Sequence, residues 1–206
     1  TVVLDSRPVE NVQINLSVTD IAEASISSST LIFNPSNWSS ERTIIVTGLD
    51  DLLTDGNANY IVVIGPVSST DPNYAVINPT DVSGVNIDDD VAGITVGAIS
   101  GNTSEAGGTA TFTLVLDTEP TENVFIGISS SDTTEGNVST SSVTFTSENW
   151  DTPQTITVTG VNDSVDDGDV AYTLILNAST SADEAYDGID PNNIAVSNTD
   201  NDTAGI

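Results

Sequence analysis

The sequence predicts an all-β chain built from two antiparallel β-sandwiches in tandem. Three observations lead to this fold class. The chain repeats itself at a spacing of 112 residues, so that Trp38 recurs as Trp150 and the segment 43–51 recurs at 155–163. Short runs alternate apolar residues with Thr or Ser and are rich in β-branched side chains. Gly, Pro, Asn and Asp separate these runs, and a fixed period marks an array of equivalent structural units.

The second repeat, residues 93–202, contains a full set of expected strands. Seven short strands at regular spacing predict a seven-stranded immunoglobulin-like antiparallel sandwich. The expected strands are 94–99, 111–116, 124–128, 143–146, 155–159, 171–176 and 194–197. A unit of roughly 100 residues is long enough to bury a core of its own.

The first repeat, residues 1–92, is expected to lack its N-terminal strand. Segment 1–4 corresponds to the second strand of the other repeat, so the counterpart of residues 93–110 would lie upstream of residue 1. Either that segment is outside this chain, or another segment fills the open sheet edge, because an unpaired edge invites strand addition. The expected strands are 1–4, 12–16, 31–33, 43–47, 59–64 and 82–87.

The connection between the repeats is short. Only Val91 and Ala92 separate the aspartate run 88–90 from Gly93. Such a connection predicts a head-to-tail arrangement with little hinge freedom. Residues 203–206 match the opening of a repeat and predict the start of a further one.

The charge balance of the chain is extreme. It carries 31 acidic residues, two arginines and no lysine or histidine, for a formal net charge of −29. Nucleic acid and anionic membrane surfaces are excluded as partners, because both are bound through clustered Lys and Arg. No apolar run is long enough for membrane insertion, and a chain without cysteine forms no disulfide. The acids imply either a divalent counter-cation or a hydrated acidic surface suited to a salty medium.

Most acids that both repeats retain fall in the loops between strands. In a sandwich, the loops after the first, third, fifth and seventh strands gather at one end. Carboxylates crowded there cannot all stay ionised without a counter-cation. Oxygen ligands on flexible loops, without His or Cys, favour calcium over zinc or copper. The candidate ligands are Glu105, Glu135, Asp163, Asp167, Asp200 and Asp202 in the second repeat, and Glu23, Asp50, Asp51, Asp55, Asp88, Asp89 and Asp90 in the first.

Three motifs resemble those of the Calx-beta domain, the calcium-binding β-sandwich module of sodium/calcium exchangers and of large bacterial surface proteins. They are Ser104-Glu105-Ala-Gly-Gly, the aspartate pair that follows a Val-Thr-Gly strand, and the junction segment 88–94. The resemblance covers essentially the whole chain. It implies a tandem of Calx-beta domains whose calcium ligands are the acids named above.

The second repeat departs from the first at two of these positions. Asn162 and Asn201 stand where the first repeat has Asp50 and Asp89. Asparagine keeps an oxygen ligand but removes a charge, so we expect the second repeat to bind fewer ions or to bind them more weakly. The first repeat lacks a counterpart of Glu105, because the segment that would carry it is absent.

Three classes of function are compatible with a domain of this kind: a calcium-stiffened structural repeat, an adhesive module and an enzyme. Without His, Cys or Lys, most nucleophile–base pairs cannot be built. A glycosidase-type carboxylate pair is conceivable, but the acids recur in both repeats, which fits a repeated structural site better. We therefore predict that the chain is not an enzyme.

The structural repeat is favoured over the adhesin. We expect calcium at the junction to restrict bending between neighbouring repeats of an extracellular or cell-surface protein. The alternative is an adhesive module that binds a carbohydrate or protein ligand through its loops. Trp38 and Trp150 could form a sugar-stacking platform, but packing against the core is the favoured role. Asp71 and Asp183 are expected to form turns and not to bind metal.

Overall fold

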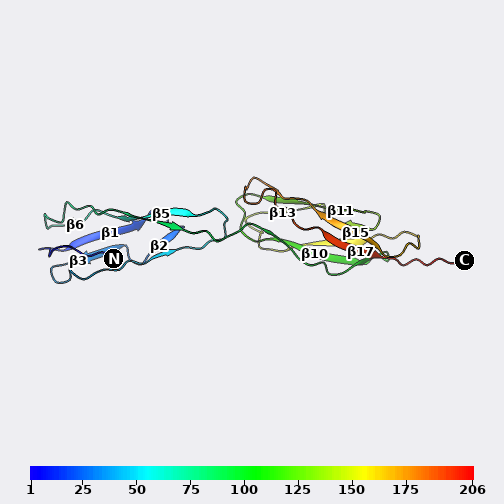
Figure 1. Cartoon of the computed structure of the whole chain (residues 1–206), viewed down its shortest axis with the longest axis horizontal. Coiled ribbons are helices and arrows are strands. Elements are labelled where there is room, and N and C mark those ends of the chain that lie inside the picture. Colours follow the sequence, from blue (N-terminus) through cyan, green and yellow to red (C-terminus); the bar gives the residue numbers. More distant parts are fainter. The chain divides into compact units, whose positions relative to one another are not determined.

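The computed structural model describes residues 1–206 and contains strands but no helix (Figure 1). The chain divides into two compact units. One comprises Thr1–Asp51 and Asp55–Asp89, and the other comprises Leu52–Thr54 and Asp90–Ile206. The predicted all-β architecture with two tandem domains is confirmed.

The second repeat is a sandwich of two sheets. The order of strands in one sheet is β12-β14-β10-β8, and in the other it is β13-β11-β15-β17-β9, with β16 paired to β11. The first sheet contains β8 (Ile94–Val96), β10 (Thr109–Leu116), β12 (Gly136–Val138) and β14 (Gln154–Gly160). The second contains β9 (Thr103–Ser104), β11 (Val124–Ser130), β13 (Ser142–Phe145), β15 (Val170–Leu176), β16 (Thr180–Ser181) and β17 (Ile194–Thr199).

Alternation along the strands sorts the side chains between core and solvent. In β10, Ala110, Phe112, Leu114 and Leu116 are each at most 3% exposed, and the threonines between them point to the other face. Strand β14 pairs antiparallel with β10 in the register Phe112↔Ile156. The inward residues of both sheets form one core around Phe112, Phe145 and Tyr186. The alternating sequence pattern is therefore sufficient to form the hydrophobic core of this repeat.

The first strand of the second repeat is divided between the two sheets. The expected strand 94–99 is shorter, because β8 ends at Val96 and the chain then crosses to the other sheet. There β9 pairs with β17 in parallel, which is the one parallel ladder of the structure. Gly97 lies at the crossing, where a Cβ would come within 2.2 Å of the Thr113 hydroxyl. The glycine therefore permits the close approach that the crossing requires.

The first repeat retains one sheet of comparable size and only part of the other. The order of strands is β3-β1-β5-β7, with β6 paired to β1, and β2 pairs with β4 in a separate two-stranded sheet. These strands are β1 (Val12–Val18), β2 (Ala24–Ile26), β3 (Thr30–Phe33), β4 (Val46–Gly48), β5 (Ala58–Ile64), β6 (Ser68–Ser69) and β7 (Val82–Asn86).

Two expected strands of the first repeat are reduced. Segment 1–4 makes only an isolated bridge, Val2↔Arg42, and the expected strand 43–47 is found as β4, Val46–Gly48. In the second repeat β10 lies between β8 and β14. Within residues 1–206, segment 1–4 is paired on one side only, through the bridge to Arg42.

The tryptophans and the two predicted turn aspartates have structural roles. Trp38 and Trp150 are half-buried against the cores of their repeats, which confirms the packing role. Asp183 accepts hydrogen bonds from the backbone N–H groups of Thr121 (2.8 Å) and Ala185 (2.9 Å). Asp71 does the same in the first repeat, accepting from Val9 at 2.9 Å. Both aspartates therefore fix turns, as predicted.

Candidate metal centre

The candidate ligands of the second repeat gather at one end of the sandwich because of where the strands end. Glu105 directly follows β9, and Asp200 and Asp202 follow β17, which runs parallel to β9. Asp163 and Asp167 lie in the loop between β14 and β15, and Glu135 directly precedes β12. Four separate loops thus supply carboxylates to one region.

Five of these carboxylates form two groups that share one member. Glu105, Asp163 and Asp202 offer oxygens within 4.8 Å of one another, and so do Glu135, Asp163 and Asp167. Asp163 is therefore placed between two other pairs of acids. Carboxylates this close repel one another unless a cation or a proton lies between them.

Asp200 belongs to neither group, because its oxygens are used inside the loops. It accepts hydrogen bonds from the backbone N–H groups of Asp202 (2.7 Å) and Gly168 (2.8 Å). These two donors hold the pKa of Asp200 below its usual range. Gly168 has a φ of 77°, a conformation that glycine adopts without strain. Asp200 thus stays ionised and ties the loop after β17 to the loop after β14.

Glu105 and Glu135 are buried carboxylates. Glu105 is 4% exposed and accepts a hydrogen bond from the Asn201 backbone N–H at 3.2 Å. That bond lowers the pKa of Glu105, but burial and repulsion from Asp200, Asp163 and Asp202 together outweigh it, so the pKa is raised. Glu135 is 6% exposed and accepts from the Asn198 side-chain amide at 3.3 Å. Buried acids in such a cluster are held at an energetic cost.

One oxygen of this cluster has no donor. Oδ2 of Asp202 is buried and makes no hydrogen bond, although buried polar atoms are nearly always paired. Asp202 belongs to the group with Glu105 and Asp163. The candidate ligand atoms are all carboxylate oxygens, they come from loops, and the groups contain no nitrogen or sulfur ligand. This donor set fits a hard cation of the size and charge of calcium.

A hydrogen-bonded layer under the acids was not predicted from the sequence. The Asn198 amide donates to Glu135 and to the Val161 carbonyl oxygen (2.9 Å). Its oxygen lies 3.0 Å from the Thr103 hydroxyl, which in turn lies 2.9 Å from the Tyr172 hydroxyl. The internal repeat of the sequence could have indicated this layer, because Asn86 of the first repeat occupies the position that matches Asn198.

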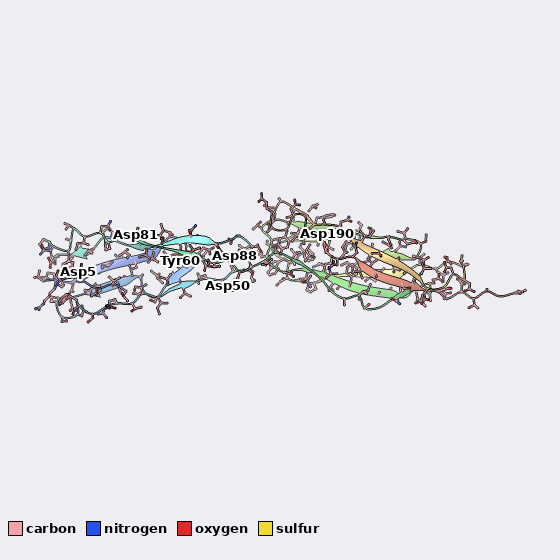
Figure 2. All side chains as sticks on the ribbon, in the orientation of Figure 1. Asp5, Asp50, Tyr60, Asp81, Asp88 and Asp190 are labelled. Carbon is pink, nitrogen blue, oxygen red and sulfur yellow. The ribbon has the colours of Figure 1, made fainter.

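The first repeat places its acids in matching groups. Glu23, Asp51 and Asp55 correspond position for position to Glu135, Asp163 and Asp167 and lie equally close together. Asp88 accepts from the Gly56 backbone N–H at 2.7 Å, as Asp200 does from Gly168. Figure 2 shows Asp50 and Asp88 at one end of the first repeat and Asp5 at the other.

A further group consists of Asp50, Asp89 and Asp90. In the second repeat the counterparts of the first two are Asn162 and Asn201, and the Asn201 side-chain amide donates to the Asn162 oxygen at 2.9 Å. The amide pair satisfies itself without a cation, whereas two aspartates in those places cannot. The structure thus brings together every candidate ligand except Asp88 and Asp200, which lie alongside and order the loops.

Comparison of the sequence with models of protein families finds one domain type. The sequence model of the Calx-beta domain matches residues 23–91 and again residues 88–202. The chain belongs to the Calx-beta family. Calx-beta domains are calcium-binding β-sandwich modules with structural or binding roles, so the two matches account for the tandem sandwiches and for the acidic loops. A comparison with curated proteins returned no match. The Calx-beta pair contains no helix that could span a lipid bilayer.

Proposed function

We propose that this chain is a calcium-binding structural repeat of a large extracellular or cell-surface protein. The observation that carries the proposal is the donorless Oδ2 of Asp202, buried among acids that repel one another. A calcium ion at this position would neutralise the group and give that oxygen a partner. The recurrence of matching acids in both repeats supports a structural site over a single active centre.

The second repeat would hold calcium at two positions that share Asp163. Glu105 and Asp202 would complete one position, and Glu135 and Asp167 the other. Backbone carbonyls and water would supply the remaining oxygens that calcium requires. In the first repeat, Asp51 would hold an ion with Glu23 and Asp55, and Asp50, Asp89 and Asp90 would hold another.

Calcium would also stiffen the connection between neighbouring repeats. Residues 88–90 immediately precede the opening of the second repeat at Gly93, with only two residues between them. Ordering the loop that carries these acids would restrict the φ and ψ angles of the connection. Small-angle X-ray scattering tests this role, because calcium should narrow the distribution of interatomic distances and a chelator should broaden it.

The alternative function is an adhesive module for a carbohydrate or protein ligand. Sugar binding would be favoured by exposed indoles beside a groove. Trp38 and Trp150 are both half-buried against the cores, so the structural repeat remains the better supported function.

Thermal unfolding with excess calcium and with a chelator, at constant ionic strength, tests calcium binding. We expect a large calcium-specific rise in the unfolding midpoint, with magnesium as the control ion. Asp190→Asn is the matched control variant, because Asp190 is an exposed acid in the loop between β16 and β17, away from the clustered acids. An equal shift from magnesium or sodium would instead establish a hydrated acidic surface.

A further inference from the structure

One buried amide connects the segments that carry the clustered acids of the second repeat. Asn198 is 1% exposed, and its nitrogen donates to Oε2 of Glu135 at 3.3 Å and to the Val161 carbonyl oxygen at 2.9 Å. The oxygen of the amide accepts from the Thr103 hydroxyl at 3.0 Å. The nitrogen and the oxygen of this amide therefore both have partners inside the protein.

Each partner of the amide lies on a different acid-bearing segment. Thr103 lies two residues before Glu105, and Val161 lies two residues before Asp163. Glu135 is itself a candidate ligand, and its backbone carbonyl oxygen accepts from the Val161 N–H at 3.0 Å. The amide therefore sets the positions of three segments relative to β17, the strand that carries it and leads into the fourth.

A glycine makes room for the amide in each repeat. A Cβ on Gly160 would lie 2.4 Å from Oδ1 of Asn198. In the first repeat, a Cβ on Gly48 would lie 2.3 Å from Oδ1 of Asn86. Non-bonded carbon and oxygen atoms do not approach so closely, so the glycine that ends each Val-Thr-Gly strand permits the contact.

The first repeat makes the same arrangement a second time. The Asn86 amide donates to Oε2 of Glu23 at 3.1 Å and to the Leu49 carbonyl oxygen at 2.6 Å. Leu49 lies two residues before Asp51, and its N–H donates to the Glu23 carbonyl oxygen at 2.9 Å. Glu23 and Asp51 belong to one group of acids. The same donor thus meets the same kind of carboxylate at the same spacing in both repeats.

An amide is suited to this task because it donates without carrying a charge. A lysine or arginine in its place would neutralise the glutamate and compete with a cation. An aspartate would add to the repulsion among the acids. A neutral donor fixes the direction of the glutamate and leaves its negative charge for an ion, as outer hydrogen-bond partners of metal ligands do.

We propose that Asn198, and Asn86 in the first repeat, are the positioning residues of the metal centres. Each holds its glutamate and the start of the neighbouring acidic loop in place before an ion binds, and neither contacts the ion. This inference rests on the calcium binding proposed above and adds the residue that sets its affinity. Loss of an outer partner commonly weakens metal binding by about 10–100-fold, and we expect an effect of that size.

Calcium titrations of the full chain, followed by nuclear magnetic resonance, test both repeats in one sample. The backbone N–H groups of Gly168 and Gly56, each bonded to an aspartate, report the acidic loops of the second and first repeats. Asn198→Leu keeps the branching of the side chain and removes its polar atoms. It should raise the Kd measured at Gly168 by about 10–100-fold and leave that at Gly56 within about twofold. Asn86→Leu should do the reverse.

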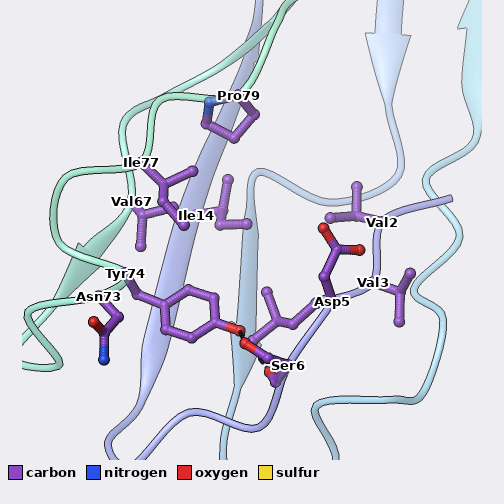
Figure 3. A pocket seen from close by; sticks show the side chains of 11 residues that line it. Val2, Val3, Asp5, Ser6, Ile14, Val67, Asn73, Tyr74, Ile77 and Pro79 are labelled. Atoms are coloured by element: carbon purple, nitrogen blue, oxygen red, sulfur yellow. Dashed lines mark hydrogen bonds between the residues drawn. The ribbon is translucent and has the colours of Figure 1, made fainter.

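Two tyrosines provide matched structural controls away from the clustered acids. In Figure 3 the Tyr74 hydroxyl reaches Ser6, to whose carbonyl oxygen it donates at 2.5 Å, beside a cavity of about 440 Å³. Its counterpart Tyr186 donates to the Thr118 carbonyl oxygen at 2.7 Å. Tyr74→Phe and Tyr186→Phe should lower the unfolding midpoint in chelator and leave the Kd of their repeats within about twofold.

A second measurement needs no ion. Because the amides are engaged before calcium binds, the side-chain N–H groups of Asn198 and Asn86 should exchange slowly with solvent in chelator. Those of Asn137, which is exposed on β12, should exchange fast. If Asn198→Leu does not fold, Thr103→Val removes one bond to the amide and should raise the Kd at Gly168 by at least about twofold.

The proposal is overturned if Asn198→Leu leaves the Kd at Gly168 unchanged, or if Tyr186→Phe raises it equally. Side-chain N–H groups of Asn198 that exchange fast until calcium is added would also overturn it, because the ion would then create the contact. If calcium moves neither glycine signal in the unsubstituted chain, the proposed function fails and this inference fails with it. A normal calcium response that Asn198→Leu does not alter overturns this inference alone.

Discussion

The position of Asp163 between two groups of acids makes its removal the sharpest test of the metal centre. Asp163→Asn keeps an oxygen that can accept the Val165 backbone N–H at 2.8 Å but removes the charge that both groups share. Asp202→Asn and Glu135→Gln each alter only one group. If two ions bind, the first variant should therefore lose both, and each of the others should lose one.

The size of the effect follows from binding linkage. Extracellular calcium modules commonly have a Kd of about 10⁻⁴–10⁻³ M. At 10 mM calcium, each ion would then stabilise the folded repeat by about 1.4–2.7 kcal/mol. For a domain of this size that corresponds to about 5–10 °C in the unfolding midpoint for each ion. Asp163→Asn should lose the calcium shift of both ions, and Asp202→Asn or Glu135→Gln about half of it.

The calcium-free state should respond in the opposite direction. Two carboxylates 4.8 Å apart repel by roughly 1 kcal/mol where water screens them. Because Asp163 lies close to two pairs of acids, Asp163→Asn should raise the midpoint in chelator by at least about 4 °C. Differential scanning calorimetry of the variants, with and without calcium, measures both effects. The shared position is refuted if Asp163→Asn loses no more of the calcium shift than Asp202→Asn does.

Four further predictions concern single residues of the second repeat. Asp183→Ala should destabilise it by about 1–3 kcal/mol in urea unfolding, because two part-buried hydrogen bonds to its carboxylate are lost, and should leave calcium binding intact. Burial raises the pKa of Asp183, but the N–H groups of Thr121 and Ala185 together lower it more strongly, so the pKa lies below 3.8. The ionised Asp183 therefore stabilises the fold above pH 3.8, and this stabilisation is lost as pH falls through the lowered pKa. The pH dependence should vanish in Asp183→Asn. The pKa of Glu105 is raised, so the folded state favours its protonated form. In chelator, the stability should therefore fall as pH rises from 4.5 through that pKa. Unfolding curves in saturating calcium should show no such fall. Gly160→Ala should destabilise markedly because its Cβ would lie 2.3 Å from the Ser104 carbonyl oxygen, whereas Gly101→Ala, with nothing within 4 Å, should be tolerated in the same assay.

The long strands and the end of the sandwich that carries the acids could be predicted from the sequence. Alternation in β10 and β14 defines both the strands and their buried faces, and the repeat shows which acids recur. The family and the two-domain fold were confirmed, because the Calx-beta model matches residues 23–91 and 88–202.

Features that depend on neighbouring strands could not be predicted in this way. Strand β12 contains only Gly-Asn-Val, which has little intrinsic preference for a strand and is ordered by its pairing with β14. Segment 1–4 has the right alternating pattern, but within residues 1–206 it pairs only through the bridge between Val2 and Arg42. The role of Asn198 under the acids depends on side-chain direction, because it connects Glu135 with Thr103 across two sheets.

The parallel pairing of β9 with β17 has a mechanical consequence. In sequence, β9 lies near the N-terminal end of the second repeat and β17 near its C-terminal end, and the two strands pair with Thr103 opposite Asn198. The Glu105 backbone N–H extends this pairing by donating to the Thr199 carbonyl oxygen at 3.0 Å. Tension applied at both ends of the repeat would pull parallel neighbours past each other, so their hydrogen bonds would be loaded in shear and would resist together. Glu105 and Asp202 stand just beyond these strands, and an ion held by both would join the two segments that tension tries to slide apart.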